Sequence, residues 1–267
     1  MDIKGYFDNI PHEPLMQLVR ERIADGKVLD LIEAFLKQKI EEKGIITEPE
    51  RGSPQGGIIS PLLANIYLDP LDWLLASLGI KSIRYADDIV ILAASARDAG
   101  DALEKVREWM RGAGLSLHPE KTRLVDMNEA LAHFDFLGYR FLRTRKGKLM
   151  RLIRPKSEKK LRESLKPATR RANAKSLPAI ITEINPVLEG WFNYFQQAWE
   201  GSHKKMDQWV RMRLRSILRM RDKGQGRGHG LDHIKWPNRY FDDHGLWSLE
   251  QARKRKQMSL RCQGANC

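Results

Sequence analysis

The sequence predicts an α+β domain, built from an antiparallel sheet with packed helices, followed by an α-helical domain. Residues 82–94 predict a hairpin, because apolar residues flank an acidic pair on both sides. Apolar residues recur at helical spacing in two segments before this hairpin, 11–43 and 61–78, and in one segment after it, 98–112, which predicts helices there. From Ser157 onward the apolar spacing is helical, which separates the second part of the chain from the first.

The first domain is predicted to cover residues 1–155 in a split β-α-β arrangement. A strand-like entry at Asp2 leads through a loop into the first helical stretch. Loops that contain glycine and proline separate the helical stretches from one another. A short strand at 121–127 and a hairpin over 134–154 complete the predicted sheet.

The second domain is predicted to cover residues 156–267. Ser157 begins its first helix, and the segment 178–197 carries enough apolar residues at helical spacing for a buried core. A further helix over 203–221 has one apolar face and one face rich in arginine. The glycine-rich stretch 223–230 predicts a flexible basic loop, since each glycine costs about 1 kcal/mol in a helix.

Composition is that of a globular protein. Apolar residues make up 42% of the chain, and no uninterrupted apolar run is long enough to span a bilayer. The N-terminus lacks the basic and then apolar plan of a secretory signal. Cys262 and Cys267 are the only cysteines. This excludes a disulfide framework and favours a reducing cytoplasm.

Charge is divided unevenly along the chain. Residues 1–142 contain 17 Lys and Arg against 23 Asp and Glu, a net charge of −6. Residues 143–267 contain 30 Lys and Arg against 11 Asp and Glu, a net charge of +19. This division indicates a first half that carries the chemistry and a second half that binds a polyanion, for which RNA is favoured.

Two adjacent aspartates, Asp87 and Asp88, occupy the turn of the predicted hairpin. Like charges at such a turn repel unless a cation lies between them. Asp2 supplies a third carboxylate from a separate strand, and a two-metal site needs ligands from more than one strand. Two divalent ions about 4 Å apart are how polymerases and nucleases hold a phosphoryl-transfer centre. The alternative is an aspartate-rich surface turn, which is common.

A loop from Arg51 to Gly56, rich in glycine and proline, leads into the apolar helix over 61–78. Glycine lets the backbone approach a ligand closely, and the N-terminus of the following helix favours phosphate. Such a loop is weak evidence alone, but it forms an ordered set with Asp2 and the acidic turn.

This ordered set resembles the palm of a reverse transcriptase, specifically that of group II intron-encoded reverse transcriptase/maturases. The stretch Asp2–Ile10 resembles the first catalytic motif of the family, and Arg51–Gly56 resembles its loop that contacts template and nucleotide. Tyr85–Asp88 resembles the metal-binding turn, and Gly114–Thr122 resembles the motif that follows it.

Further stretches resemble the remaining parts of that family. Phe136–Phe141 resembles the primer-gripping hairpin. Gly190–Phe195 and Ile234–Phe241 resemble the maturase domain, the equivalent of a polymerase thumb. Their aromatic residues are expected in the core in preference to base-stacking platforms. Within the hairpin, the expected primer contacts are Leu137, Gly138 and Tyr139.

The resemblance implies an RNA-directed DNA polymerase that uses two Mg²⁺ ions, with Mn²⁺ as a substitute. Asp2 and Asp87 would bind both ions, with Ile3 as a further metal contact and Asp88 as a weaker ligand. One ion would lower the pKa of the primer 3′-hydroxyl, and the other would hold the triphosphate and the leaving pyrophosphate. Lys121 is implied as the acid for the pyrophosphate, with a surface lysine as the alternative.

Phe7 stands five residues after Asp2, where polymerases of this type keep an aromatic residue that blocks a ribose 2′-hydroxyl. The alternative for Phe7 is a core phenylalanine beside Tyr6. The other residues that the resemblance assigns to substrate binding are Arg51, Gln55, Gly56 and Tyr85.

Three partners follow from the resemblance: intron RNA, an RNA template with a DNA primer, and deoxynucleoside triphosphates. The resemblance also implies a bacterial-type cytoplasmic location with activity at the nucleoid. No membrane partner is expected, and the sequence gives no oligomeric state. The RNA contacts are assigned to arginines of the second half, namely Arg211, Arg213, Arg215, Arg219, Arg221 and Arg227. A zinc site is a separate hypothesis, because the spacing matches no compact finger. It concerns His229, His233, Cys262 and Cys267.

One departure from the family pattern bears on activity. Family members carry a fingers region before the first catalytic aspartate, whereas Asp2 follows the initiator methionine here. The sequence is therefore expected to be a fragment, a relic or half of a split protein, without the optional C-terminal nuclease domain. Two alternative functions stay open: a non-catalytic RNA-binding maturase, and a reverse transcriptase of another retroelement or phage-defence lineage.

Overall fold

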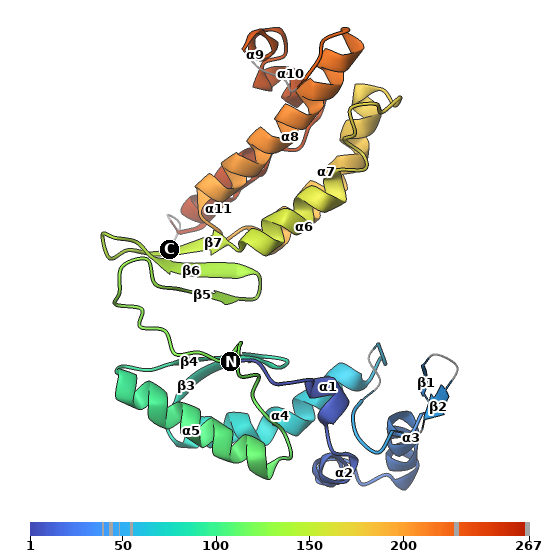
Figure 1. Cartoon of the computed structure of the whole chain (residues 1–267), viewed down its shortest axis with the longest axis vertical. Coiled ribbons are helices and arrows are strands. Elements are labelled where there is room, and N and C mark those ends of the chain that lie inside the picture. Colours follow the sequence, from blue (N-terminus) through green and yellow to red (C-terminus); the bar gives the residue numbers. More distant parts are fainter. Residues whose placement is uncertain (39, 43–44, 48, 54–55, 227–229, 265–267) are drawn as a thin grey trace. The chain divides into compact units, whose positions relative to one another are not determined.

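The structure is a computed structural model that describes the chain except for residues 39, 43–44, 48, 54–55, 227–229 and 265–267. For residues 40–42, 45–47 and 260–264 it describes only the backbone. The chain forms two compact units, Met1–Asp126 and Met127–Cys267. Figure 1 draws both units, coloured along the sequence.

The helices and strands of the first unit follow one another along the chain. They are α1 Tyr6–Asn9, α2 His12–Arg20, α3 Gly26–Leu36, β1 Ile40–Glu42, β2 Ile45–Thr47, α4 Ser60–Ser77, β3 Lys81–Tyr85, β4 Asp88–Leu92 and α5 Ala96–Gly112.

Two predicted elements of the first unit are wrong. The helix predicted over 11–43 is interrupted after α2, because Asp25 begins α3 by accepting bonds from two backbone N–H groups, at 2.8 and 3.3 Å. Beyond α3, Ile40–Glu42 pairs antiparallel with Ile45–Thr47, and β-branched isoleucine favours strands. The segment 121–127, predicted as a strand, contains no strand.

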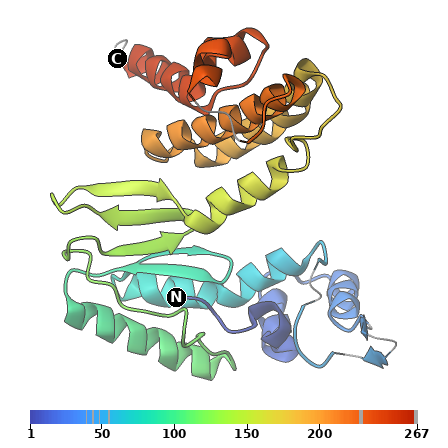
Figure 2. The ribbon, with the colours of Figure 1, turned by 45° about the horizontal axis from the view of Figure 1, so that its top comes forward.

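Helices α4 and α5 lie on one face of the β3–β4 hairpin, as Figures 1 and 2 show. Two tyrosines connect these helices to their neighbours: the hydroxyl of Tyr6 donates to the carbonyl of Ala64, and that of Tyr67 donates to Ala113 at 2.6 Å. Burial raises the pKa of both tyrosines, so both stay protonated donors. The core around them includes Ile3, Ile10, Leu15, Leu36, Leu63, Leu68, Leu71, Ile89, Val106 and Met110.

The start of the chain is an extended segment that lies between β4 and the segment 116–118. Met1 exchanges two backbone hydrogen bonds with Ile89, at 2.7 and 3.0 Å. On the other side, Ile3 forms an antiparallel bridge with Leu117, and backbone bonds of 2.8 and 2.9 Å flank this bridge. The first four residues are therefore held from both sides.

The second unit begins with strands and continues with helices. Its elements are β5 His133–Phe136, β6 Tyr139–Arg143, β7 Leu149–Ile153, α6 Pro155–Leu165, α7 Leu177–Phe195, α8 Glu200–Arg221, α9 Leu231–Lys235, α10 Asn238–Asp243 and α11 Leu249–Gly264.

In the second unit, an antiparallel sheet in the order β5-β6-β7 precedes a helical core. Helix α11 packs along α8 (Figure 1). The compact units divide at residue 126, so this sheet belongs to the second unit. The predicted domain boundary at residue 155 stays a prediction. Buried residues of the helical core include Leu161, Leu165, Ile180, Ile184, Leu188, Met206, Val210, Leu214, Ile217 and Phe241.

Asp207 joins α8 to the start of α11. Its buried carboxylate accepts hydrogen bonds from the Ser248 hydroxyl at 2.7 Å and from the backbone N–H groups of Leu249 and Glu250, each at 3.0 Å. A carboxylate at a helix N-terminus satisfies donors that have no partner within the helix. Asp207 therefore fixes where α11 begins.

The elements confirm the predicted α+β class with a helical second part. Residues 223–226 of the predicted glycine-rich loop form no helix, and residues 227–229 lie outside the described residues. Among the described helices, none has the length and apolar character needed to cross a lipid bilayer.

Candidate functional site

Asp2, on the extended first segment, faces Asp88, the first residue of β4. Met1 and Ile89 exchange both of their backbone hydrogen bonds, which defines an antiparallel hydrogen-bonded pair. The next residue along one strand, Asp2, therefore faces the preceding residue on the other, Asp88. In such a non-hydrogen-bonded pair, the side chains lie closer together than in the neighbouring pairs.

Asp87 lies in the tight turn between β3 and β4. Tyr85 and Asp88 form the last register pair, so Ala86 and Asp87 make up a two-residue loop. Ala86 has a φ of 52°, a left-handed conformation that an alanine rarely adopts. Arg84 supports this turn, because its Nη1 donates to the carbonyl of Ala86 at 3.1 Å. The ring of Tyr85 is exposed beside the turn.

Lys121 reaches the carboxylate of Asp2. Its Nζ lies 3.1 Å from Oδ1 and 3.3 Å from Oδ2 of Asp2. The lysine side chain is exposed, whereas Asp2 is largely covered. The structure thus brings together two predicted catalytic residues that are 119 positions apart in the sequence.

The donor set at this end of the hairpin suits a hard divalent cation. Carboxylate oxygen is the ligand type that Mg²⁺ and Mn²⁺ prefer. The Asp2 carboxylate already binds one cation, the Lys121 ammonium. Among the described residues, no group of three or more His, Cys, Asp or Glu side chains is arranged to hold a metal ion. The type of donor thus suits these ions, while the metal roles of Asp2, Ile3, Asp87 and Asp88 stay predictions.

The loop that begins at Arg51 packs directly on the segment that carries Phe7. The backbone N–H of Gly52 donates to Ile10 at 2.8 Å, and that of Ser53 donates to the carbonyl of Phe7 at 2.7 Å. Gly52 has a φ of 90°, and a Cβ there would lie 2.9 Å from the Phe7 carbonyl oxygen. Only glycine fits this close approach.

Both interpretations of Phe7 stay open in this geometry. Phe7 is partly buried and packs at the edge of the first core, with its ring centroid 5.6 Å from that of Tyr6. Gln55 lies outside the described residues, and Gly56 is exposed with a φ of 90°.

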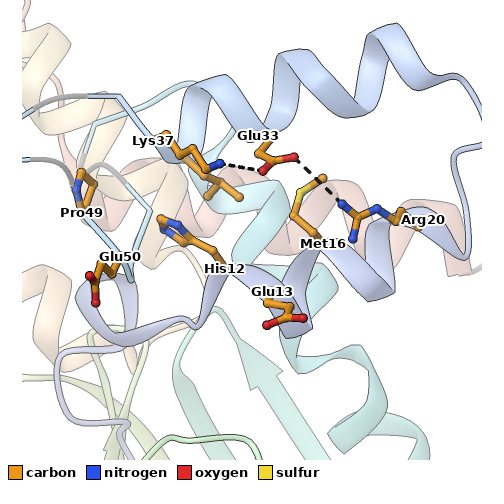
Figure 3. A pocket seen from close by; sticks show the side chains of 9 residues that line it. His12, Glu13, Met16, Arg20, Glu33, Lys37, Pro49 and Glu50 are labelled. Atoms are coloured by element: carbon orange, nitrogen blue, oxygen red, sulfur yellow. Dashed lines mark ion pairs between the residues drawn. The ribbon is translucent and has the colours of Figure 1, made fainter.

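An open cavity of about 700 Å³ lies between α2, α3 and the segment before Arg51 (Figure 3). Figure 3 shows His12 on one side and the ion pairs of Glu33 with Lys37 and Arg20 on the other. The His12 ring bonds the carbonyl of Gly52 at 2.7 Å. The cavity thus borders the glycine loop, but its lining contains none of the predicted catalytic residues.

The predicted primer-gripping residues form the turn between β5 and β6. Leu137 and Gly138 have φ angles of 48° and 79°, and Tyr139 pairs with Phe136. Two hydroxyls fix this turn to α7: Tyr139 donates to the carbonyl of Tyr194 at 2.6 Å, and Tyr194 donates to the carbonyl of Leu137 at 3.0 Å. The turn belongs to the second unit, whereas the aspartates belong to the first.

Two arginines that the sequence assigns to RNA are buried inside the second unit. Arg211 is 6% exposed and Arg215 is 2% exposed. Arg215 donates to the carbonyl of Trp236 at 2.9 Å and to the Asn238 side chain at 2.8 Å. Arg211 forms an ion pair with Asp242 at 3.3 Å. Their predicted role as exposed phosphate contacts is therefore wrong: they hold α10 and the residues before it on α8.

The other predicted arginines of α8 also contact the protein. Arg213 donates to Thr169, and Arg219 forms an ion pair with Asp232 at 2.8 Å. Arg221 donates to the backbone carbonyls that follow α6. The sequence contained a signal for this outcome, because acidic residues recur between positions 222 and 243. Arg227 lies outside the described residues, as do His229 and Cys267 of the zinc hypothesis.

Comparison with protein families identifies the two halves. Residues 1–141 match the family described as "Reverse transcriptase (RNA-dependent DNA polymerase)", and residues 158–236 match "Group II intron, maturase-specific domain". The chain belongs to the group II intron reverse transcriptase/maturase family. The resemblance stated for the sequence motifs is thereby confirmed.

Several curated proteins are similar to this reverse transcriptase/maturase. Protein YkfC of Escherichia coli K12 is 30% identical over 179 residues, which cover 54% of this chain and 46% of that protein. Group II intron-encoded protein LtrA of Lactococcus lactis subsp. cremoris is 49% identical over 80 residues, covering 30% and 13%. This chain therefore spans less than half the length of either relative.

A further relative comes from yeast. The putative COX1/OXI3 intron 1 protein of Saccharomyces cerevisiae is 26% identical over 194 residues, which cover 52% of this chain and 23% of that protein. Among solved structures, a partial Cas6-RT-Cas1–Cas2 complex is 33% identical, with a TM-score of 0.25, and covers 44% of this chain and 21% of that chain.

Proposed function

We propose that this protein is an RNA-directed DNA polymerase of a group II intron that also binds the intron RNA and assists its splicing and mobility. The observation that carries the proposal is the pairing of the chain start with β4. Because of this pairing, Asp2 faces Asp88 next to the turn that holds Asp87.

In this proposal, Asp2, Asp87 and Asp88 bind two Mg²⁺ ions, or Mn²⁺ as a substitute, with Ile3 as a further contact. When bound, the ions supply the activation of the primer 3′-hydroxyl and neutralise charge on the pyrophosphate. Lys121 donates a proton to that leaving group, and its contact with Asp2 supports this role.

The remaining substrate contacts come from the loop beside α1. Phe7 excludes the ribose 2′-hydroxyl of an incoming ribonucleotide. Arg51 and Gly56, with Gln55 between them, contact the nucleotide and the template strand. The close packing of Gly52 on Phe7 supports a shared site, because it places this loop next to Phe7, the residue proposed to contact the sugar of the nucleotide.

The basic second half binds intron RNA. Its net charge of +19 over residues 143–267 supports this part of the proposal. Because Arg211 and Arg215 are buried, the phosphate contacts fall to exposed basic residues elsewhere. These include Arg145, Lys146, Lys148, Lys156, Lys160, Lys166, Arg170 and Arg171.

The test compares Asp87→Asn with Asp30→Asn, a control on the exposed surface of α3. Primer extension on an RNA template is measured with Mg²⁺ and with Mn²⁺, and Mn²⁺ binding is measured directly by titration. The Asp87 variant is expected to lose extension by several powers of ten and to bind Mn²⁺ more weakly.

RNA binding separates the two parts of the proposal, and both variants are expected to retain it. Primer extension that survives Asp87→Asn would contradict the catalytic assignment. RNA binding without extension, in the unsubstituted chain, would favour the non-catalytic maturase.

A further inference from the structure

The linker between α7 and α8, residues 196–199, carries an exposed aromatic ring. Trp199 immediately precedes α8, and 49% of its surface is exposed. Its ring lies against the backbone of Gly201, where any Cβ would overlap the ring atoms. Gly201 therefore permits this ring position, which an alanine would displace.

The linker is anchored to β7. The backbone N–H of Trp199 donates to the carbonyl of Arg151 at 2.6 Å. The exposed Arg151 side chain returns to the linker, because its Nη2 donates to the Gln197 side chain at 3.2 Å. The guanidinium of Arg151, on β7, thus contacts the side chain of a residue two positions before Trp199, whose indole is half exposed.

Helix α11 also contacts the linker, through two basic side chains. Nη1 of Arg253 donates to the carbonyl of Gln196 at 2.9 Å and to that of Ala198. Nζ of Lys256 binds the amide oxygen of Gln196. Figure 1 shows β7, the start of α8 and α11 at the same end of the second unit.

We propose that Trp199, Arg151 and Lys256 form a binding site for an unpaired segment of RNA. The indole stacks on one base, and the two basic side chains bind the phosphates that flank it. This inference rests on the proposed RNA binding and names a site within it.

An unpaired segment fits this surface better than a duplex does. The bases of an A-form duplex are stacked on one another and present no free face to an indole, whereas unpaired bases do. Aromatic rings next to basic side chains are the common arrangement of single-strand binding surfaces. The nearby Glu200 lies in the first turn of α8, where the helix dipole already favours a carboxylate.

Binding of the full chain to a labelled 12-nucleotide oligouridine is measured by fluorescence anisotropy, beside binding to a blunt RNA duplex. Trp199→Ala is expected to weaken binding of the single strand by about 5- to 100-fold. Duplex binding is expected to change by less than about twofold, because it relies on phosphates alone. Trp199→Tyr retains a stacking ring, so it is expected to restore most of the single-strand affinity.

The site offers matched controls. Trp73→Ala removes another exposed indole, on α4, and is expected to leave single-strand binding unchanged. Gly201→Ala keeps every charge and the tryptophan but displaces the ring, so it is expected to weaken single-strand binding. Gly190→Ala, in α7 where a Cβ meets no atom within 4 Å, is expected to have no effect.

Two outcomes would overturn the inference: unchanged single-strand affinity of folded Trp199→Ala, or an equal loss of affinity for single strand and duplex. If unchanged affinity were accompanied by a lower melting temperature of that variant, the ring would be assigned to a contact within the protein. If the unsubstituted chain bound neither RNA, the proposed function itself would fail.

Discussion

Arg84 on β3 forms a bidentate ion pair with Asp72 on α4: its Nε lies 2.9 Å from Oδ1 and 3.0 Å from Oδ2, and its Nη2 also donates to Oδ2. The same guanidinium donates to the Asn65 side chain and to the carbonyl of Ala86, at 3.0 and 3.1 Å. One side chain therefore joins α4 to the turn that presents Asp87. Ala86 has a left-handed φ, which alanine does not favour, and the contact with Arg84 helps to hold it in this conformation.

The first prediction concerns this joint. Arg84→Met removes the five hydrogen bonds of a largely buried guanidinium and leaves Asp72 without its partner. We expect the free energy of unfolding to fall by about 1–3 kcal/mol. Urea denaturation followed by circular dichroism measures it. Arg97→Met removes an exposed pair with Asp101 at 3.9 Å and should cost below about 0.5 kcal/mol. Equal losses in the two variants would contradict a supporting role for Arg84.

The second prediction concerns nucleotide choice. If Phe7 blocks the 2′-hydroxyl, Phe7→Ala should increase incorporation of ribonucleotides relative to deoxyribonucleotides by roughly 10- to 100-fold. Primer extension with each nucleotide class measures this ratio. Phe35→Ala, on the exposed face of α3, is the control and should leave the ratio unchanged. An unchanged ratio in folded Phe7→Ala would identify Phe7 as a core residue.

The third prediction concerns acid stability. His203 is fully buried, and its Nε2 lies 3.1 Å from the carbonyl oxygen of Phe195. Burial, with the nearby Arg253 charge, lowers the pKa of His203 from 6.5 to about 4. The unfolded chain therefore binds this proton near pH 6.5 while the folded chain does not, so stability falls as the pH falls from 6.5 to 4.

The expected contribution of His203 between pH 7 and pH 5 is about 2 kcal/mol. Urea denaturation at both pH values should show that His203→Gln loses less stability on acidification than the unsubstituted protein does. His233→Gln, an exposed histidine on α9, should retain the full pH dependence. A His203 variant with the same pH dependence as the unsubstituted protein would contradict the buried neutral state.

The fourth prediction separates buried from exposed basic residues. Arg215→Met should lower the free energy of unfolding by about 2–4 kcal/mol, because it leaves the buried carbonyl of Trp236 unpaired. Lys146→Ala, at the exposed tip between β6 and β7, should leave stability unchanged. Thermal melting of both variants measures the difference.

RNA binding should respond in the opposite way: it should depend on the exposed Lys146 and not on the buried Arg215. With roughly six to ten phosphate contacts, affinity should fall by about 10³ or more between 50 and 200 mM salt. Lys146→Ala should reduce the slope of this dependence by about 0.7–0.9, whereas Arg215→Met should leave it unchanged in the folded protein. A flat salt response would exclude phosphate neutralisation as the source of affinity.

Local sequence was sufficient to predict the hairpin around Asp87. Apolar residues flank a turn there, and β3 and β4 form as predicted, but the turn consists of Ala86 and Asp87, whereas Asp88, also predicted in the turn, is the first residue of β4. The sequence also placed Asp2 on a separate strand-like segment, but it did not predict the backbone pairing of that segment with β4. The break before α3 could have been seen, because Asp25 followed by Gly26 is a helix start signal.

The arginines of α8 could not be placed from spacing alone. Arg215 contacts Trp236 and Asn238, which follow it by 21 and 23 positions. Helical periodicity describes one helix and contains no information about its neighbours. A basic helix face that is exposed to solvent therefore has the same sequence pattern as one that contacts buried carbonyls and aspartates.

The contact of Asp207 with the start of α11 has a consequence for the order in which the second unit is made. The carboxylate and its three donors are separated by 41 to 43 positions, so the ribosome synthesises α8 well before its partners. Until Ser248 has been added, water must satisfy the Asp207 charge, and the side of α8 that will receive α11 stays open. We therefore expect the nascent second unit to remain susceptible to proteases at α8 until α11 docks, which makes that docking the closing step of its folding.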